Sequence, residues 1–311
     1  MKIHAQHQIL DKWVQAISPQ ESVQDAVCYS LRNRIATLQH FFPRAAISEV
    51  ESHEDIHQLR VATRRVSAVL ELYAKLLPTK PTKLLHRSLR KIQRVAGTVR
   101  DLDVLAKRYR QVEHNNCKKL VKALHRRRLR LRLRLTRLYL WLRGGDRFLN
   151  QIEKLLKKTK ESDTPNGPVG IWMKSRWSQL VEQFDQSTDF DTEDLEALHR
   201  FRIQSKQLRY SMELLAPAFD FNQLERAYAL VERLQERLGQ IQDHVIARKT
   251  FREWETKRNR ISRMCDLKLL IESEDAKLHQ QLRDVATWWT PLMKSNMRQA
   301  FEQIASATNQ S

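Results

Sequence analysis

The sequence predicts an all-α protein made of two similar halves. Its 311 residues include only 6 Gly and 8 Pro. A β protein of this length needs more of these turn-forming residues to connect its short strands. Apolar residues recur every three or four positions along most of the chain, a spacing that places them on one face of a helix. With 41% apolar residues, the chain can bury one large core or two modest ones, and an internal repeat favours two.

The repeat has an offset of 142 residues, the separation of His57 from His199. The first copy reads HQLRVATRRV from His57 and the second reads HRFRIQSKQL from His199. The same offset relates Arg60 to Arg202, Arg64 to Lys206, Glu71 to Glu213, Gly97 to Gly239, Asp101 to Asp243, Arg34 to Arg176 and Leu38 to Leu180. One register therefore spans most of the chain, and we place the first helical repeat in residues 1–150 and the second in residues 151–311.

The first two helices are expected over residues 19–42 and 54–77. Ser18-Pro19 supplies a cap and a first-turn proline for the first helix. That helix should end at Phe42-Pro43, and the second should stop before Pro78, because the residue before a proline disfavours helical backbone. Both segments carry apolar residues at helical spacing.

The rest of the first copy is also expected to be helical. Residues 84–95 and 99–112 have helical patterns, and Gly97 between them is either a break or a tight helix contact. Residues 118–142 include a strict Arg/Leu alternation, which has the period of a strand. The flanking leucines and the stripe Arg126, Arg130, Arg134 and Arg137 nevertheless follow helical spacing, so we predict a helix with one buried and one cationic side.

The second copy is expected to mirror the first. Gly144-Gly145 and the stretch Glu161–Gly170 are the clearest loops, and the second of these separates the copies. Beyond it, helices are expected at residues 169–185, 193–216, 220–239, 241–259 and 264–288, and a helical tail with Trp288-Trp289 closes the chain.

The charge balance points to an anionic partner. The formal net charge is +20 at pH 7 and the isoelectric point is near 10.1, so a bound polyanion would relieve self-repulsion in the native state. Nucleic acid, anionic lipid and inorganic polyphosphate all carry suitable charge. The remaining alternative, a merely solvated basic surface, is uncommon in a protein so far from neutrality.

The cysteine content and the hydropathy of the chain predict where in the cell the protein is located. Cys28, Cys117 and Cys265 are odd in number and lack C-x-x-C spacing, so neither a disulfide framework nor a zinc site is expected. The N-terminal MKIHAQHQILDKW lacks the apolar stretch of a signal peptide, and nowhere do about 18 apolar residues run together. We expect a cytoplasmic protein with no membrane partner, no cofactor and no metal.

Basic residues at helical spacing carry the functional prediction. His199, Arg202, Lys206 and Arg209 are three, four and three positions apart, which brings them to one helix face. Such a row of cations destabilises a bare helix, whereas phosphate oxygens would accept hydrogen bonds from the arginine forks and attract the lysine charge. The structural alternative is a pair of core histidines, with the arginines held by Glu71, Asp101, Glu213 and Asp243.

Four motifs support a family resemblance. They are H-x-L-R-V-x-x-R-R from His57, R-D-L-D-V-L from Arg100, H-x-x-R-I-x-x-K-x-L-R-Y-x-x-E from His199 and L-G-x-I-Q-D from Leu238. Each is weak alone, but together they are specific, and the chain resembles the CHAD family, the conserved histidine α-helical domain, over nearly its whole length. The resemblance implies two four-helix bundles related by pseudo-two-fold symmetry, a basic channel or cleft between them, and binding of inorganic polyphosphate, often at polyphosphate granules.

The resemblance also implies a set of anion-binding residues. Carried over by position, they are His57, Arg60, Arg64, Arg65, His199, Arg202, Lys206 and Arg209, with Arg34, Arg94 and Arg176 as weaker additions. Ser67 departs from the family pattern, because it stands in the first copy where the second has Arg209. The first half is therefore expected to bind the anion less strongly, and the Arg126 to Arg137 run either compensates or is a solvated face.

The residue pattern favours a binding protein over an enzyme. Hydrolysis of a phosphoanhydride needs a metal cage or a positioned base, yet Asp101 and Asp103 point to different sides of a helix and Asp243-His244 lacks a metal motif. No Gly-rich phosphate loop exists among the six glycines, so no catalytic residue is expected. The alternative function is nucleic-acid binding, which 7% aromatic residues and a lone Tyr210 in the basic stripes support poorly.

Overall fold

The computed structural model describes residues 11–48, 53–110, 115–162, 167–257 and 265–306. Within these ranges the regular structure is helical, apart from an isolated β-bridge between Ser22 and Pro168. The all-α prediction is therefore confirmed.

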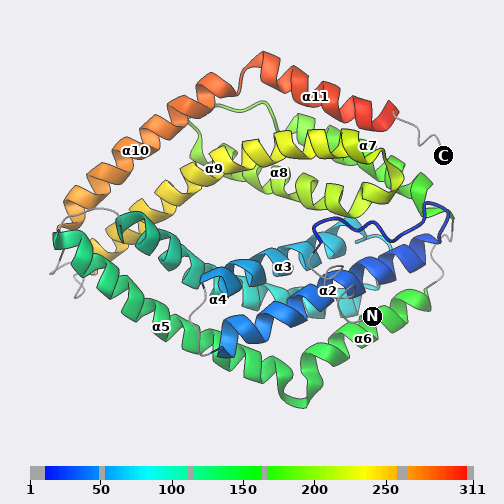
Figure 1. The fold of residues 1–311 in the computed structure, drawn as a ribbon, viewed down its shortest axis with the longest axis horizontal. Coiled ribbons are helices and arrows are strands. Elements are labelled where there is room, and N and C mark those ends of the chain that lie inside the picture. The colour runs from blue at the N-terminus through cyan, green and yellow to red at the C-terminus, as the bar shows by residue number, and fades with distance from the viewer. Residues whose placement is uncertain (1–10, 49–52, 111–114, 163–166, 258–264, 307–311) are drawn as a thin grey trace.

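The helices form two groups that follow one another along the chain (Figure 1). The first group comprises α2 (Val23–Ile47), α3 (His53–Leu72), α4 (Thr79–Arg110), α5 (Asn115–Arg143) and α6 (Arg147–Lys160). The second comprises α7 (Val169–Gln186), α8 (Leu195–Leu215), α9 (Phe221–Thr256), α10 (Leu267–Trp288) and α11 (Pro291–Ser306). Short 3-10 turns at Gly144–Asp146 and Ala216–Ala218 join α5 to α6 and α8 to α9.

The two groups place equivalent helices in the same order. Helix α8 begins 142 positions after α3, and α9 begins 142 positions after α4, which is the offset of the sequence repeat. Gln93 Nε2 donates to the carbonyl of Thr63 (3.3 Å), and at the same offset Gln235 Nε2 donates to the carbonyl of Ser205 (2.6 Å). The pairing of α3 with α4 is thus repeated by α8 with α9, whereas the expected two-fold axis stays a prediction.

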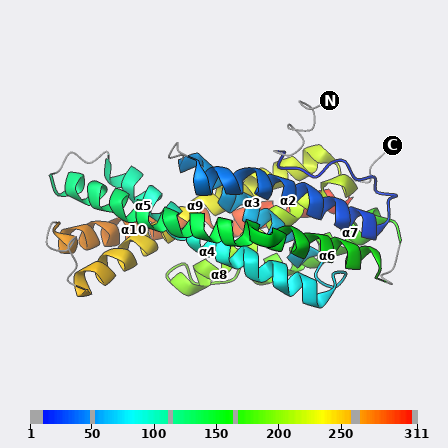
Figure 2. The same ribbon diagram turned by 90° about the horizontal axis from the view of Figure 1, so that it is seen from below.

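One hydrophobic core joins the two groups. Buried residues of α2, α3 and α4 pack in a single cluster with those of α7, α8 and α9. A smaller cluster around Leu105, Phe251 and Trp254 fills the end where α4, α5, α9 and α10 project together (Figure 2). Backbone hydrogen bonds from Val23 to Gly167 (3.2 Å) and from Val169 to Glu21 (2.8 Å) also tie the start of α2 to that of α7.

The first helix differs at both ends from the sequence prediction. It begins at Val23 rather than residue 19, because Ser22 caps it by accepting a hydrogen bond from the amide of Asp25 (3.0 Å). It continues through Pro43 to Ile47 instead of ending at Phe42. Proline removes one helical hydrogen bond, but the residues around it, among them Phe42, Ala45 and Ala46, are buried in the core and hold the last turn in place.

One predicted helix break, the one after residue 239, is also wrong, and at Gly97 one of the two predicted alternatives holds. Helix α4 runs unbroken through Gly97, and α9 runs unbroken through Gly239. An interior glycine costs a helix about 1 kcal/mol relative to alanine, which is less than the burial of neighbours such as Ala96 and Val99 contributes. Gly97 is therefore the tight contact of the two alternatives. Helix α3, in contrast, ends at Leu72, five positions before the predicted Leu77.

The Arg/Leu-rich segment is helical, as its flanking periodicity predicts. It forms α5, which buries Leu120, Leu124, Leu135 and Leu142. Helix α6 follows and packs on α2, α4 and α5. The expected boundary after residue 150 lies inside α6, and the connection to the second group comes after Lys160.

Candidate anion-binding site

Helices α3 and α8 contact each other where the two groups meet, and each brings basic side chains to this junction. Arg60 and Arg64 come from α3, and Arg202 and Lys206 come from α8. All four side chains are half-buried. We call these four residues the cation cluster.

The charges of the cation cluster act strongly on one another. The pKa of Lys206 is lowered to about 6, first by burial and then by the positive charges of Arg64, Arg202, Arg60 and Arg209 in that order. Burial and then Arg64 likewise lower the pKa of Arg60 to about 10 and shift the pKa of Arg202 downward. Burial is the largest cause of all three shifts, and repulsion between the cations adds to it.

No carboxylate lies within 4.0 Å of any member of the cation cluster, as far as the described part of the chain shows. The buried Nε of Arg202 also has no hydrogen-bond partner among the described residues. Asp101 and Asp243 act on the cluster from α4 and α9 at longer range. Burial raises the pKa of Asp101, against the opposing effect of Arg60. The guanidinium groups therefore keep donors free for an external anion.

Gly97 makes room for Arg60. A Cβ atom at residue 97 would lie 2.5 Å from Nη1 of Arg60, closer than any two such atoms can approach. Gly239, the equivalent residue of the second group, has nothing within 4 Å of the same position. The absent side chain on α4 thus lets the Arg60 guanidinium lie against the helix backbone.

Arg65 and Arg209 border the cluster but have partners of their own. Arg65 Nε donates to Glu213 Oε2 (2.7 Å) and its Nη2 donates to Oε1 (3.3 Å). Arg209 Nη1 donates to Glu232 Oε1 (2.9 Å), and its guanidinium lies over the ring of Tyr210. Arg65 thus pairs with one of the acids that the structural alternative names, Arg209 pairs with an acid outside that set, and no such pair is found for the cation cluster among the described residues.

The two repeat histidines occupy different surroundings. His57 is half-buried, and burial together with the neighbouring Arg100 charge lowers its pKa. His199 is exposed, with Nδ1 2.7 Å from Oε1 of Gln242. Because an amide oxygen can only accept, Nδ1 of His199 carries the proton in this contact. Neither histidine is fully buried, and both remain close to the cationic residues of their own helix.

The three weaker candidates do not join the cluster. Arg34 is 1% exposed and donates to the backbone carbonyls of Asp11 (2.9 Å) and Lys12 (2.6 Å), so it ties the N-terminal segment to α2. Arg176 donates to Gln179 one turn along α7 (2.8 Å). Arg94 is exposed on α4, and the structure shows no contact between it and the cluster.

Sequence reasoning did not select Arg100, and it noted Ser67 only as a departure from the pattern of the second copy. Arg100 acts on both His57 and Arg60, and the signal that could have found it is its place directly before Asp101 in the R-D-L-D-V-L motif. Ser67 accepts a hydrogen bond from Gln93 (2.9 Å). A polar bridge between α3 and α4 therefore stands where the second group has Arg209.

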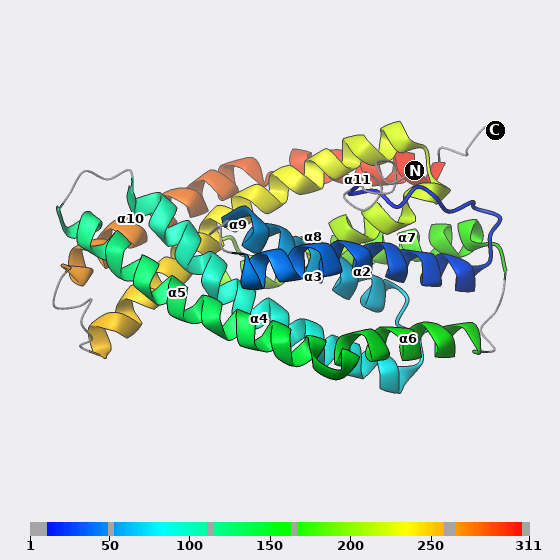
Figure 3. The same ribbon diagram turned by 60° about the horizontal axis from the view of Figure 1, so that its bottom comes forward.

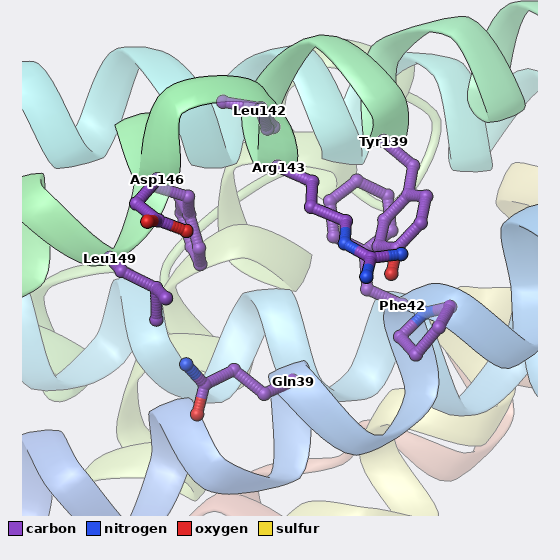
Figure 4. Close-up of a pocket in the computed structure, with 9 residues that line it drawn as sticks. Gln39, Phe42, Tyr139, Leu142, Arg143, Asp146 and Leu149 are labelled. Atoms are coloured by element: carbon purple, nitrogen blue, oxygen red, sulfur yellow. The ribbon is translucent and has the colours of Figure 1, made fainter.

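Two of the hollows among the described helices can be compared with the cation cluster. A groove of about 460 Å³ between α8 and α9 is lined by His199 and Arg202 together with apolar residues such as Ile241, so it adjoins the cation cluster. A separate hollow of about 160 Å³ lies between α2, α5 and α6, where Gln39, Tyr139, Arg143 and Leu149 surround it (Figure 4). Its lining is largely apolar and includes none of the candidate site residues.

Residues 30–252 match the model of the CHAD domain. The chain belongs to the CHAD family. The crystal structure of the CHAD domain from the plant Ricinus communis has a TM-score of 0.75 at 20% identity, covering 94% of this chain and 96% of that one. PptA from Streptomyces chartreusis has a TM-score of 0.50 at 18% identity, covering 92% and 99%. These likenesses establish the CHAD fold.

Sequence relatives extend the comparison. Two uncharacterized proteins from strains of Mycobacterium tuberculosis are 27% identical to this CHAD chain over 213 residues, which is 64% of the chain. The chain spans 40% of the length of these relatives. Among the described residues, no helix is long and apolar enough to cross a membrane. The same residues contain no group of three or more His, Cys, Asp or Glu side chains that could hold a metal ion.

Proposed function

We propose that this CHAD protein binds inorganic polyphosphate at the junction of its two helical groups. The observation that carries the proposal is the cation cluster, in which Arg60, Arg64, Arg202 and Lys206 are half-buried with no carboxylate of the described chain within 4.0 Å. Keeping like charges together without neutralising them costs folding free energy. A bound polyanion offsets that cost, and the CHAD family is associated with polyphosphate binding in general.

The arrangement suits a chain of phosphates better than a single phosphate. The basic residues extend from His57 to Arg65 on α3 and from His199 to Arg209 on α8. Ten residues of helix span about 15 Å, which is several phosphate units. Phosphate oxygens can accept two hydrogen bonds from one guanidinium, so successive units can each find a donor.

Nucleic acid fits the site less well. Single-strand binding uses aromatic side chains on which bases stack, and Tyr210, the aromatic residue of the basic stripe, is 5% exposed. The cations are recessed between helices rather than spread on an open surface, which favours a thin polymer without bases. Polyphosphate is therefore the preferred ligand.

We propose binding without hydrolysis. Asp101 and Asp243 act on Arg60 and Arg202 at longer range, and we propose that their charge helps to orient these cations and does not activate a water molecule. The role that follows is to attach the protein to polyphosphate granules or to organise the polymer there. A fluorescent fusion should form foci in cells that make polyphosphate and stay diffuse in cells that lack it.

Calorimetric titration tests the ligand. Long-chain polyphosphate should bind more tightly than orthophosphate or sulfate at physiological salt, and binding should weaken steeply as salt rises because condensed counterions are released. Arg60→Ala combined with Arg202→Ala should weaken binding by about 2 to 5 kcal/mol from lost charge-assisted contacts, with helicity retained by circular dichroism.

Three results would overturn the proposal. The first is equal affinity for polyphosphate and sulfate. The second is displacement of polyphosphate by nucleic acid at equal charge concentration. The third is shortening of the polymer on incubation with Mg²⁺ or Mn²⁺, which would assign an enzyme.

A further inference from the structure

Helix α5 exposes leucines on its outer face. Leu129, Leu133 and Leu140 are 38%, 58% and 53% exposed. Their spacing of four and seven residues places them on one side of the helix, opposite the buried leucines. Helix α5 lies at the outer edge of the molecule in Figure 3, and the exposed fractions of the three leucines place this apolar stripe on its solvent side.

A stripe of arginines runs beside the leucines. Arg126, Arg130, Arg134 and Arg137 are exposed and spaced by four, four and three residues. Each exposed leucine comes three positions after one of them, which makes the two stripes neighbours on the helix surface. No ion pair to any of these four arginines is found in the described part of the chain. We call the two stripes together the α5 face.

The α5 face is not part of the duplicated site. Helix α5 contains eleven Lys and Arg residues and no Asp or Glu. Helix α10, which occupies the corresponding place in the second group, contains three Lys and Arg residues against four Asp and Glu. The cationic character therefore belongs to one half alone, and a function shared by both repeats does not account for it.

A partner of the α5 face must match both its apolar stripe and its cationic stripe. A phosphate polymer would engage the arginines but leave the leucines in water. An apolar groove in a protein would take the leucines but needs acidic residues on its rim to match the arginines. An anionic bilayer surface matches both stripes, because leucines enter the acyl boundary while arginines stay at the lipid phosphates.

We infer that the α5 face docks on the surface of a bilayer that contains anionic lipids. The helix is 29 residues long, or about 43 Å, and would lie in the plane of the interface without crossing it. Trp141, 46% exposed at the end of α5 with Lys91 Nζ 4.6 Å from its ring centre, adds an aromatic residue of the kind enriched at such interfaces. The cation cluster is left free for its own ligand.

Vesicle sedimentation of the full chain tests the inference. The protein should bind phosphatidylcholine vesicles that contain phosphatidylglycerol and should not bind phosphatidylcholine alone. Replacing the three leucines together, as Leu129→Gln, Leu133→Gln and Leu140→Gln, keeps every charge and should lower vesicle affinity by at least about tenfold. Replacing Arg126, Arg130, Arg134 and Arg137 with Gln should lower it by a similar factor.

Matched controls show whether vesicle binding depends on the α5 face, on any exposed apolar residue or on the cation cluster. Ile171→Gln, Leu269→Gln and Leu292→Gln remove three comparably exposed apolar residues from α7, α10 and α11 and should not change vesicle binding. Arg60→Ala with Arg202→Ala should also leave it intact. Circular dichroism checks that each variant is folded.

A labelled cysteine reports insertion directly. Cys28, Cys117 and Cys265 are buried, so an environment-sensitive fluorophore reacts selectively with Leu133→Cys. Its emission should shift to the blue on anionic vesicles, and the same label at Ile171→Cys should not respond. The inference is overturned if the leucine variant binds vesicles like the unaltered protein, if Arg60→Ala with Arg202→Ala abolishes vesicle binding, or if an acidic amphipathic peptide produces the blue shift and vesicles do not.

Discussion

Nη1 of Arg60 lies in the space that a Cβ atom at Gly97 would occupy, at a separation of 2.5 Å. The end of the Arg60 side chain therefore lies close to α4 at Gly97, and an added side chain there would force the guanidinium to move. A glycine in the middle of a helix normally lowers stability. Here the missing side chain leaves room for Arg60, a residue that we propose binds the ligand.

Gly97→Ala should therefore weaken polyphosphate binding by about 1.5 to 3 kcal/mol, because the displaced guanidinium loses a charged hydrogen bond to the ligand. Gly239→Ala is the matched control, since nothing lies within 4 Å of the added methyl group. It should raise the free energy of unfolding by about 1 kcal/mol through helix propensity and leave binding unchanged. Titration and thermal unfolding of both variants check this, and equal binding by the two would refute a role for the Gly97 contact.

Arg64 and Arg65 are neighbours in sequence with opposite roles. Arg64 belongs to the cation cluster, whereas Arg65 is paired with the buried Glu213 at 2.7 Å. Arg64→Ala should lower polyphosphate affinity by about 1.5 to 3 kcal/mol and leave stability equal or higher, since it removes repulsion. Arg65→Ala should lower the free energy of unfolding by about 3 to 5 kcal/mol, because it leaves a carboxylate poorly compensated. Urea unfolding and titration separate the two effects, and a binding loss confined to Arg65→Ala would reverse the assignment.

Much of this fold could be predicted from the sequence. The spacing of leucines and valines gave the helices, and the 142-residue repeat gave the correspondence of α3 with α8 and of α4 with α9. Helix ends were less predictable, because proline and glycine signal a break only when tertiary packing does not override them. Pro43 and Gly97 both lie inside helices, since the residues around them are buried in the core.

The candidate site could be predicted in part. A shared helix face brought Arg60, Arg64, Arg202 and Lys206 into consideration, but the sequence could not tell which cations have acidic partners. Glu213 lies 148 positions from Arg65 and 179 from Arg34, so these ion pairs depend on the packing of helices from different halves. The spacing of residues within one helix does not predict contacts between helices so far apart in the sequence.

Glu213 holds this packing together, and its replacement should be costly. The carboxylate is 1% exposed and accepts hydrogen bonds from Arg65 and from the hydroxyl of Tyr228 (3.0 Å), with Arg34 Nη2 at 3.5 Å. These partners come from α2, α3 and α9. Glu213→Gln should lower the free energy of unfolding by about 3 to 5 kcal/mol, because it leaves Arg34 and Arg65 without a counter-charge.

Glu232→Gln serves as the comparison for Glu213→Gln. Glu232 pairs with Arg209 at 2.9 Å, but its side chain is 45% exposed, and exposed pairs contribute about 0 to 1 kcal/mol. The loss of unfolding free energy, measured by urea unfolding, should therefore be several-fold larger for Glu213→Gln than for Glu232→Gln. Similar losses would show that burial of Glu213 does not set its contribution.

Lys206 makes the stability of the ligand-free protein depend on pH. Its pKa of about 6 lies below the ordinary value of 10.5, first because of burial and then because of Arg64. Between these two values the unfolded chain binds more protons at this residue than the folded chain, so the free energy of unfolding should rise with pH across that window. Below about pH 6 the charge is present in both states and the full cost of burying it remains. Lys206→Met should flatten the rise, which denaturant titrations in buffers free of phosphate and sulfate can measure.

The same residue couples ligand binding to protons. A phosphate chain brings negative charge to Lys206 and favours its protonated form, so binding near pH 7 should take up protons and affinity should increase as pH falls toward 6. Calorimetry in buffers of different ionisation enthalpy measures this uptake. Lys206→Met should remove most of it, with the remainder assigned to His57, whose pKa burial and Arg100 also lower. The exposed Lys268→Met variant should retain it in full, because Lys268 lies on α10 outside the cation cluster. Proton uptake that is unchanged in Lys206→Met would show that the lysine is already charged before the ligand arrives.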